Sequence, residues 1–322
     1  MTWWQALLDA GAVPGNGRKS DEPEAGDQAD VVEGVELDTH AIPVPQIPSP
    51  VSFLNGIERW SVVAYDGVVQ VVSAYVAAAV RRRDRRGELH TTVERSRAFA
   101  IAPLERMSTP VRDELERTAS DIERVDGDLV EQPARYLDMI ETTVRRARAH
   151  LERELAEESV DGLGAEEWLV LDGRLSRSPS VARHPRTLGV IKSHGAQFLA
   201  GRGLERALTL PAGQRTSVFA VRAGHTRTEV YSWYVRLWPW EGNDLLYGLL
   251  RVEARAHADT IAQAPSLSAW LYAERAPLAT PATRWDRLLY PLHHVEEYLK
   301  ARAPRDLQSR RGGASRLPRT GT

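Results

Sequence analysis

The chain has 322 residues, of which 42% are hydrophobic and 27% charged, and its formal net charge is -2. This size and composition allow one large core or two modest ones, and no uncharged apolar stretch approaches the roughly 20 residues of a membrane helix. Because cysteine is absent, disulfides, thiolate chemistry and cysteine-bound zinc are excluded. The opening MTWWQALLDAGA has neither a basic start nor a long apolar run, so we expect no secretory signal and a cytoplasmic protein.

Charge is distributed unevenly along the chain. Residues 20–38 carry eight acidic and no basic side chains, whereas residues 302–322 carry six arginines and one aspartate. Without the acidic segment the chain is net basic, which permits a nucleic-acid-binding surface. The basic side chains are almost all arginine, and lysine occurs only at positions 19, 192 and 300.

The first expected element is a short helix at residues 3–9. Residues 14–50 are acidic and contain glycine and proline, so we expect a flexible linker, because such a segment buries too little apolar surface to become ordered. The alternative is that VELDTHAIPVP, which has some apolar character, is a strand that docks onto a partner. From residue 51 to about 80, an apolar segment predicts a meander of antiparallel strands with tight turns at Asn55-Gly56 and Asp66-Gly67.

Two helices are expected within residues 108–158. Thr109-Pro110 begins the first helix, and Pro133 suits the first turn of the second. Apolar residues in the second helix recur at spacings of three and four, which predicts one buried stripe: Leu137, Ile140, Val144, Ala147, Leu151 and Leu155.

The rest of the chain predicts alternating strands and closing helices. Strands are expected at residues 166–173, 187–194, 218–223, 228–240 and 245–256, followed by helices at 266–276 and 284–301. This order indicates a mixed α/β fold. Strands enclose helices over more than 200 residues, so we expect one domain at residues 51–301, preceded by the segment 1–50 and followed by a disordered basic tail at 302–322.

Asp172 is the first candidate for chemistry. It ends a strand of four apolar residues and precedes Gly173, so the sheet would hold its carboxylate rigidly while leaving it accessible. Hard divalent cations require such oxygen ligands, and enzymes of phosphoryl transfer use paired metals to stabilise the attacking and leaving oxygens. The alternative is that Asp-Gly only forms a turn.

Two glutamates and a lysine accompany this aspartate. Glu141 and Glu152 are 11 residues apart, so they share one face of the second helix, although a solvated helix rich in Glu–Arg pairs explains them equally well. Lys192 ends the strand GVIKSH, and a compact ammonium suits a phosphate or a metal-bound hydroxide. Neutral replacement of arginine is the alternative for Lys192.

Basic and aromatic residues are interleaved on the late strands, a combination that suits single-stranded DNA through backbone charge and base stacking. Because side chains alternate along a strand, Trp233 and Val235 share one face, and we expect Trp233 in the core. The candidates for DNA binding are Arg215, Tyr234, Arg236 and Arg251. On the last helix, His293 and His294 stand beside Glu296 and Glu297, where histidine serves as a ligand, as an acid–base group or as a surface residue.

Several common catalytic patterns are missing from the sequence. It contains no P-loop, no G-x-G-x-x-G, no G-x-S-x-G and no H-E-x-x-H, so ATP hydrolysis, dinucleotide redox chemistry and serine hydrolysis lose their usual support. The strand that ends at Lys192 also lacks the acid two residues earlier that a PD-(D/E)xK nuclease would have.

Taken in order, the segments FLNGIER, a long helix with glutamate, WLVLDGRL, GVIKSH, SWYVRL, GLLRVEA and RWDRLLYP resemble the NurA nuclease family over about residues 51–301. The resemblance implies an RNase H-like mixed sheet flanked by helices in a single domain. It also implies a homodimer that depends on Mn²⁺ (or Mg²⁺) and processes DNA ends in complex with a hexameric HerA-type ATPase.

The resemblance also implies roles for single residues. Asp172 corresponds to the aspartate at the end of a central strand, Glu152 to the helix carboxylate, with Glu141 in reserve, and Lys192 to the lysine of the following strand. The last helix would supply one more ligand, either His294 or Glu296.

Asn55 departs from the family pattern, because the family's first acid normally stands at this position. An amide oxygen can coordinate a cation but brings no negative charge, so a two-metal site would hold its second ion less firmly. Asp66 is a substitute ligand, although Asp66-Gly67 is better explained as a hairpin turn.

Two functions are therefore expected from the sequence. In the first, the protein is a metal-dependent DNA nuclease in which Asp172, Glu152, Asn55 and His294 hold the metal and Lys192 steadies the scissile phosphate. In the second, it is a NurA-like protein with little or no cleavage that binds DNA ends or serves as a structural partner of the HerA ring. The amide at position 55 favours the second function.

Overall fold

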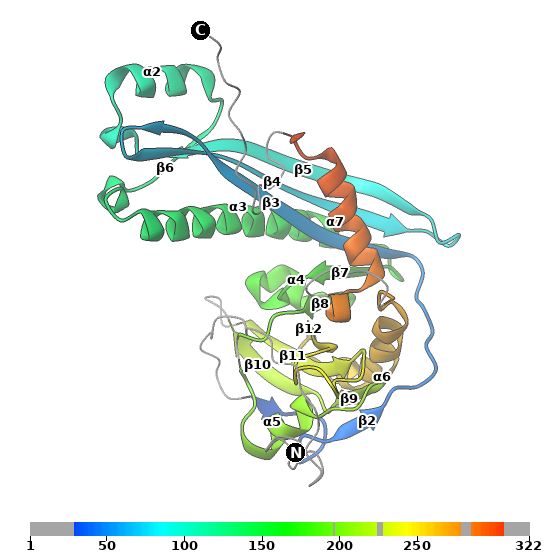
Figure 1. Ribbon diagram of the computed structural model, residues 1–322. Helices are drawn as coiled ribbons and strands as arrows, with labels where there is room; N and C mark the ends of the chain where they lie inside the picture. Colours follow the sequence, from blue (N-terminus) through cyan, green and yellow to red (C-terminus); the bar gives the residue numbers. More distant parts are fainter. Residues whose placement is uncertain (1–28, 196, 224–227, 278–284, 306–322) are drawn as a thin grey trace. The chain divides into compact units, whose positions relative to one another are not determined.

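The computed structural model describes residues 29–195, 197–223, 228–277 and 285–305 of a mixed α/β chain with one large mixed sheet (Figure 1). The chain divides into two compact units, and each unit is assembled from three separate segments. Among the described residues, unit 1 lies within 29–55, 80–93 and 153–295, and unit 2 lies within 56–79, 94–152 and 296–305. The single domain expected at 51–301 stays a prediction. The expected helix at 3–9 and residues 306–322 of the tail lie outside the described residues.

Unit 1 contains the larger part of the sheet, in the strand order β1-β10-β11-β12-β8-β7-β3-β4-β5, with β9 paired to β11 and β2 paired to β9. These strands are β1 (Asp30–Val31), β2 (Thr39–Ala41), β3 (Val51–Asp66), β4 (Val69–Arg83), β5 (Leu89–Ala102), β7 (Trp168–Asp172), β8 (Thr187–Ile191), β9 (Gln214–Thr216), β10 (Phe219–Ala223), β11 (Thr228–Arg236) and β12 (Leu249–Arg255).

The centre of this sheet is parallel. Strand β7 pairs in parallel with β3 on one side and with β8 on the other, whereas β12, β11, β10 and β1 continue the sheet as antiparallel neighbours. The first four residues of β7 and all five of β8 are buried, as expected for strands covered on both faces. Strands β7 and β8 therefore confirm the apolar runs predicted at 166–173 and 187–194.

Helices cover both faces of the sheet in unit 1. The Trp233 indole on β11 donates to Ser268 Oγ of α6 (Ala258–Ala273) over 2.9 Å, and Val252 of β12 is the register partner of Trp233. Glu253, the next residue of β12, accepts from the backbone of η3 (Leu175–Arg177) on the opposite face. The expected core position of Trp233 is confirmed, since its side chain is fully buried. The remaining elements are α4 (Pro179–Arg183), α5 (Gly201–Leu208), η4 (Trp285–Arg287) and α7 (Tyr290–Arg302), of which the last continues into unit 2.

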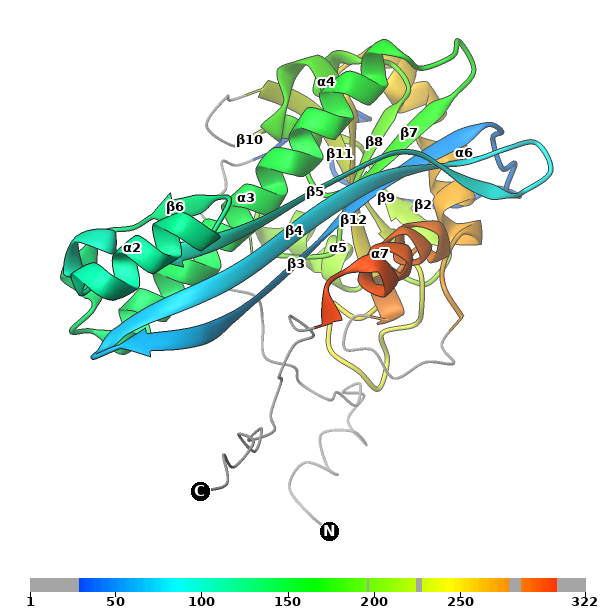
Figure 2. The same cartoon turned by 90° about the horizontal axis from the view of Figure 1, so that it is seen from above.

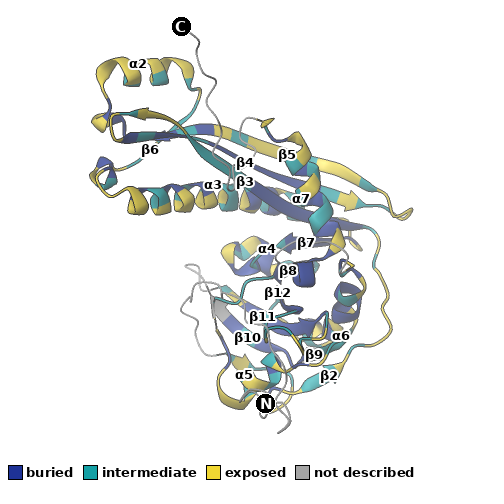
Figure 3. Ribbon diagram, in the orientation of Figure 1, coloured by how far each residue is buried: buried dark blue, intermediate teal, exposed yellow. Residues whose placement is uncertain are grey.

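Unit 2 consists of the other halves of β3, β4 and β5 together with β6 (Ile122–Arg124), η1 (Leu104–Arg106), α2 (Thr109–Thr118), η2 (Gly127–Leu129) and the first part of α3 (Pro133–Asp161). Helix α3 runs along one face of these strands (Figures 1 and 2). Its Tyr136, Ile140 and Val144 pack into one core with Val72 and Val76 of β4, while its outer side is exposed (Figure 3). The predicted stripe on the second helix is thus present, with Tyr136 buried at its start and Leu137 half-buried.

Strand β3 corrects the predicted meander. It continues without interruption from Val51 to Asp66, so Asn55-Gly56 is not a hairpin turn. The predicted turn at Asp66-Gly67 is confirmed, because Gly67 has a φ of 60° between the ends of β3 and β4. Asp66 accepts hydrogen bonds from the Ser108 backbone N–H and hydroxyl, 2.6 and 3.1 Å away, so its carboxylate holds the start of α2.

Part of the expected flexible linker is ordered as strands. Strand β1 pairs with β10 and β2 pairs with β9, and the Glu33 carboxylate between them makes two hydrogen bonds with the Arg215 guanidinium at 2.6 and 2.7 Å. Backbone pairing and this ion pair supply the order that the composition alone does not. No helix in the described part of the chain combines the length and apolarity needed to cross a membrane.

Candidate functional site

Asp172 stands at the carboxyl end of β7, as the sequence predicts. The buried residues before it anchor the strand, and Gly173 after it has a φ of 148°, a conformation that favours glycine. The Asp172 side chain keeps 21% of its surface exposed. A rigidly mounted, partly accessible carboxylate is suited to bind a cation or a polar ligand.

Lys192 lies against this carboxylate. Its Nζ is 2.6 Å from Asp172 Oδ2, and its side chain is 10% exposed. Lys192 directly follows β8, and its carbonyl accepts a hydrogen bond from Arg287 Nη1 of η4 at 2.5 Å. The structure thus brings together two of the predicted site residues and leaves Asp172 Oδ1 without a hydrogen bond from the described residues.

Asn55 lies level with Asp172 on the neighbouring strand β3, which continues past it. The last register pair of β3 and β7 is Leu54 with Leu171, so Asn55 and Asp172 are the next residues of two adjacent parallel strands and point to the same face. Asn55 is 3% exposed, and its Nδ2 donates to the Leu292 carbonyl of α7 over 3.0 Å. The amide therefore has a structural partner as well as a place beside the candidate site.

Glu152 belongs to unit 2, where it is buried on α3. Its Oε1 is 3.4 Å from Arg148 Nη1, and a Cβ added at Gly56 would lie only 2.4 Å from the same oxygen. Gly56 therefore gives the Glu152 side chain room against β3. Glu141, the reserve candidate, is exposed and pairs with Arg145 at 2.5 Å, as in the alternative of a solvated Glu–Arg pair.

His294 faces a cation rather than a metal-binding group. Arg81 Nη1 lies 2.8 Å from His294 Nδ1, an arrangement in which the guanidinium donates and the ring nitrogen accepts. Burial and the Arg81 charge lower the pKa of His294. Arg81 thus faces Nδ1 of His294, so a metal would have to bind through Nε2, and the role of His294 as a ligand stays a prediction. Glu296, the other last-helix candidate, belongs to unit 2 and pairs with Lys300 at 2.7 Å.

The four residues predicted to bind DNA are buried, which corrects that prediction. Arg215 is 2%, Arg251 1%, Tyr234 7% and Arg236 0% exposed. Arg215 pairs with Glu33, and Arg251 pairs with Glu253 at 2.8 Å. These side chains are used inside unit 1 and are not presented to a DNA strand.

The hydrogen bonds of Arg236 explain why its side chain is buried. Its guanidinium donates to the carbonyls of Leu208 and Leu210 at 2.6 and 3.0 Å, to Leu245 at 3.1 Å and to Tyr247. Burial lowers its pKa to about 10, so it is charged at neutral pH. The guanidinium thus donates to backbone carbonyls of two segments, residues 208–210 and 245–247. Its planar array of donors suits several carbonyls at once.

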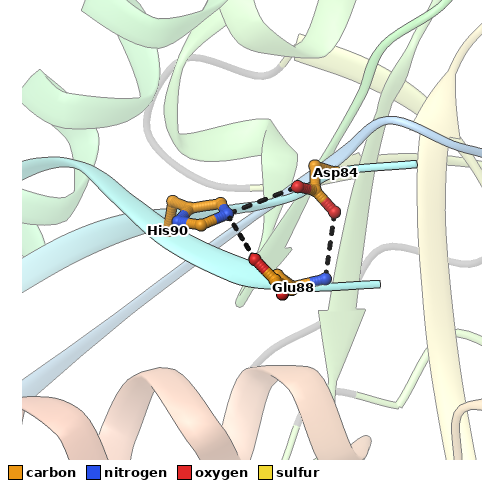
Figure 4. A group of neighbouring side chains, drawn as sticks. All are labelled: Asp84, Glu88 and His90. Carbon is orange, nitrogen blue, oxygen red and sulfur yellow. Dashed lines mark hydrogen bonds and ion pairs between the residues drawn. The ribbon is translucent and has the colours of Figure 1, made fainter. Parts of the chain in front are cut away.

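A separate group of three metal-ligating side chains lies in unit 1, at the turn between β4 and β5 (Figure 4). His90 Nε2 is 3.3 Å from Asp84 Oδ2 and 3.6 Å from Glu88 Oε2. Asp84 Oδ1 accepts the backbone N–H groups of Arg86 and Glu88 at 2.8 and 3.0 Å. The hydrogen bond from the Glu88 N–H is the main cause of the lowered pKa of Asp84.

This group could hold a metal ion through two carboxylates and one imidazole, a donor set that suits several divalent metals. Its side chains are half-exposed or exposed, and surface ion pairs within a tight turn account for the same contacts. This group is not among the residues predicted from the sequence, although Asp84, Glu88 and His90 are closely spaced around Gly87.

Compared with known protein families and with characterised proteins, the chain shows no match.

Proposed function

We propose that this protein is a metal-dependent deoxyribonuclease that processes DNA ends in the cytoplasm. The observation that carries the proposal is the Asp172–Lys192 pair at the carboxyl end of the parallel strands, with Asn55 in the equivalent position on β3. The mixed sheet with helices on both faces is compatible with an RNase H-like fold. The order of motifs along residues 51–301 supports a NurA-like homodimer that works beside a HerA-type ATPase.

The donor set partly fits a hard divalent cation. Asp172 offers a carboxylate oxygen that accepts no hydrogen bond from the described residues, and Asn55 would add an amide oxygen. A bound Mn²⁺ or Mg²⁺ would supply Lewis acidity and a water of lowered pKa.

Lys192 has two tasks in this proposal. Without a ligand its ammonium neutralises Asp172, which stabilises a carboxylate at a largely buried position. With DNA present, the same ammonium would bind a non-bridging oxygen of the scissile phosphate, where negative charge increases during attack. Asp172 would then be free to orient toward the cation.

A second candidate function is supported by Asn55. Its amide brings no charge to the site and is already bonded to the Leu292 carbonyl, so it holds β3 to α7 whether or not a cation binds. Under this alternative the protein is a catalytically weakened NurA-like partner of the HerA ring that binds DNA ends.

The test is cleavage of linear DNA with Mn²⁺, with and without the ATPase. We expect Asp172→Ala to abolish cleavage and Asp161→Ala, which removes an exposed acid of the same unit, to leave it unchanged. Equal cleavage by wild type and Asp172→Ala contradicts the first function. If Asn55→Asp raises the rate, position 55 is a weakened ligand, and no cleavage by either form favours the second function.

Metal binding needs its own control, because the turn at Asp84, Glu88 and His90 could bind Mn²⁺ independently. Isothermal titration of wild type, Asp172→Ala and His90→Ala with Mn²⁺ separates the two places. We expect Asp172→Ala to remove the binding that accompanies cleavage and His90→Ala to leave it intact. Loss of that binding in His90→Ala alone would place the ion at the turn.

A further inference from the structure

The chain that leaves Asp172 lies directly on strand β8. A Cβ added at Gly189 would meet the Gly173 carbonyl oxygen at 2.6 Å and the Leu175 backbone nitrogen at 3.1 Å. Residues 173–175 therefore occupy the space where any other residue at position 189 would place its side chain. Because Gly189 precedes Lys192 by three residues on the same strand segment, this contact joins the segments that carry both members of the Asp172–Lys192 pair.

Glu253 of the neighbouring strand β12 binds the segment that lies over Gly189. It is the register partner of Gly189 on β12, so its side chain projects on the face where the 173–175 segment lies. Its Oε2 accepts the backbone N–H of Leu175 at 2.8 Å and of Ser176 at 3.4 Å. Glu253 thus satisfies donors at the start of η3, which immediately follows the turn after Asp172.

The burial of the Glu253 carboxylate is compensated by an ion pair and by hydrogen bonds. Glu253 is 0% exposed, and its Oε1 accepts from Arg251 Nη1 at 2.8 Å. The Arg251 guanidinium in turn lies 4.7 Å from the Phe198 ring centroid. Removing a charge from water is unfavourable unless charge and hydrogen bonds compensate it, and here both oxygens of the carboxylate are engaged.

We propose that Glu253 is a positioning residue of the site: by accepting the Leu175 and Ser176 N–H groups over Gly189, it fixes the direction in which the chain leaves Asp172 and so holds the Asp172 carboxylate against Lys192. The proposal rests on the proposed function of Asp172 and Lys192. Glu253 itself acts through the backbone and contacts neither DNA nor metal. Arg251, expected from sequence to bind DNA, supports Glu253 instead.

The first variant that tests this role is Glu253→Gln. Glutamine has the same shape but only one acceptor oxygen, so an amide NH₂ must face either the two backbone donors or the Arg251 guanidinium. We expect kcat for linear DNA and the Mn²⁺ affinity, measured by electron paramagnetic resonance, to fall about 10- to 100-fold, with KM for DNA unchanged. Hydrogen exchange at the Leu175 and Ser176 amides should become about tenfold faster.

A control and a second variant separate positioning from stability. Val252→Ala shortens the neighbouring residue of β12 on the opposite face, so it should lower thermal stability while kcat, Mn²⁺ affinity and exchange of residues 173–177 stay at wild-type values. Gly189→Ala displaces the same segment with Glu253 intact, so it should reproduce the losses of Glu253→Gln. The Gly189→Ala variant still tests the positioning role if Glu253→Gln does not fold.

The inference is overturned if Gly189→Ala, or a folded Glu253→Gln, keeps the wild-type kcat and Mn²⁺ affinity. It is also overturned if hydrogen exchange at Leu175 and Ser176 is unchanged in Glu253→Gln. Losses of the same size in Val252→Ala would overturn it as well. Failure of the proposed function is a different result, in which wild type neither cleaves DNA nor binds Mn²⁺ through Asp172. The exchange measurement then still decides whether Glu253 fixes the segment after Asp172.

Discussion

At the residue scale, the contact between Lys192 and Asp172 makes a prediction about charge. Lys192→Met removes the cation 2.6 Å from Asp172 Oδ2 and preserves most of the side-chain volume. If this ammonium stabilises charge on the phosphate, cleavage of linear DNA in Mn²⁺ should fall about 100-fold. Lys192→Arg, which keeps the charge in a wider planar group, should retain part of the activity. Wild-type cleavage by Lys192→Met would exclude Lys192 from the chemistry.

Gly56 gives a way to move Glu152 without changing its charge. In Gly56→Ala the new Cβ would lie 2.4 Å from Glu152 Oε1 and 3.0 Å from its Cγ, so the carboxylate must leave its place against β3. Because this displaces a buried side chain in a packed region, we expect the free energy of unfolding to fall by about 1–3 kcal/mol, measured by thermal melting. Gly162→Ala, whose Cβ would meet only the Ser159 carbonyl at 3.8 Å, is the matched control. Equal melting midpoints for wild type and Gly56→Ala would show that the Glu152 side chain moves aside without cost.

At the element scale, Glu33 connects the N-terminal strands to the rest of unit 1. Its carboxylate accepts two hydrogen bonds from Arg215 and one from the Val218 N–H at 2.9 Å. The Arg215 side chain is 3% and the Glu33 side chain 19% exposed, and leaving a buried charged donor without its partner costs about 1–3 kcal/mol. We therefore expect Glu33→Gln to lower the free energy of unfolding by about that amount, measured by urea denaturation, whereas Glu36→Gln, 76% exposed at its side chain, should be neutral.

The same ion pair makes stability depend on pH. Burial alone would raise the pKa of Glu33, but the hydrogen bonds from Arg215 and Val218 outweigh it, and the pKa is lowered from the ordinary 4.5. The unfolded chain thus binds the proton first on acidification, so the contribution of Glu33 is complete above pH 4.5 and is lost as the pH falls through the folded-state value. The stability difference between wild type and Glu33→Gln should shrink below pH 4.5, and a constant difference down to pH 2 would contradict this.

The elements differ in how far the sequence predicts them. The strands β7, β8 and β10 to β12 and the starts of α2 and α3 follow local periodicity and caps. Strands β1 and β2 do not, because their order depends on pairing with β10 and β9 in an acidic, proline-containing segment. Strand β5, LHTTVERSRAFAIA, is largely polar before Phe99, so apolar alternation is limited to its last residues. The turn signal of Asn55-Gly56 is overridden by the sheet pairing on β3.

The residues of the candidate site also differ in how far the sequence predicts them. Asp172 and Lys192 were predicted because each ends an apolar strand, and the register of adjacent strands places them in contact. Glu253 and Gly189 depend on a cross-strand pair that no local pattern reveals. The interleaved arginines and aromatics were misassigned to a DNA surface because composition does not show that Arg236 and Arg251 serve buried carbonyls and a buried carboxylate.

At the scale of the whole molecule, the path of the chain predicts how it unfolds. The elements β3, β4, β5, α3 and α7 each begin in one unit and end in the other, so neither unit can lose its structure without interrupting a strand or helix of the other. We therefore expect one cooperative thermal transition, with calorimetric and van't Hoff enthalpies in agreement.

Two variants test this cooperativity. Gly189→Ala strains the sheet of unit 1 by bringing a Cβ to 2.6 Å from the Gly173 oxygen, and Val72→Ala opens the core of unit 2, where Val72 is 0% exposed. Overpacking and large-to-small changes in a core each destabilise by about 1–3 kcal/mol. Both variants should lower the midpoint of the same single transition in differential scanning calorimetry. Two separated transitions, with each variant shifting only one, would mean that the units unfold independently despite the shared strands and helices.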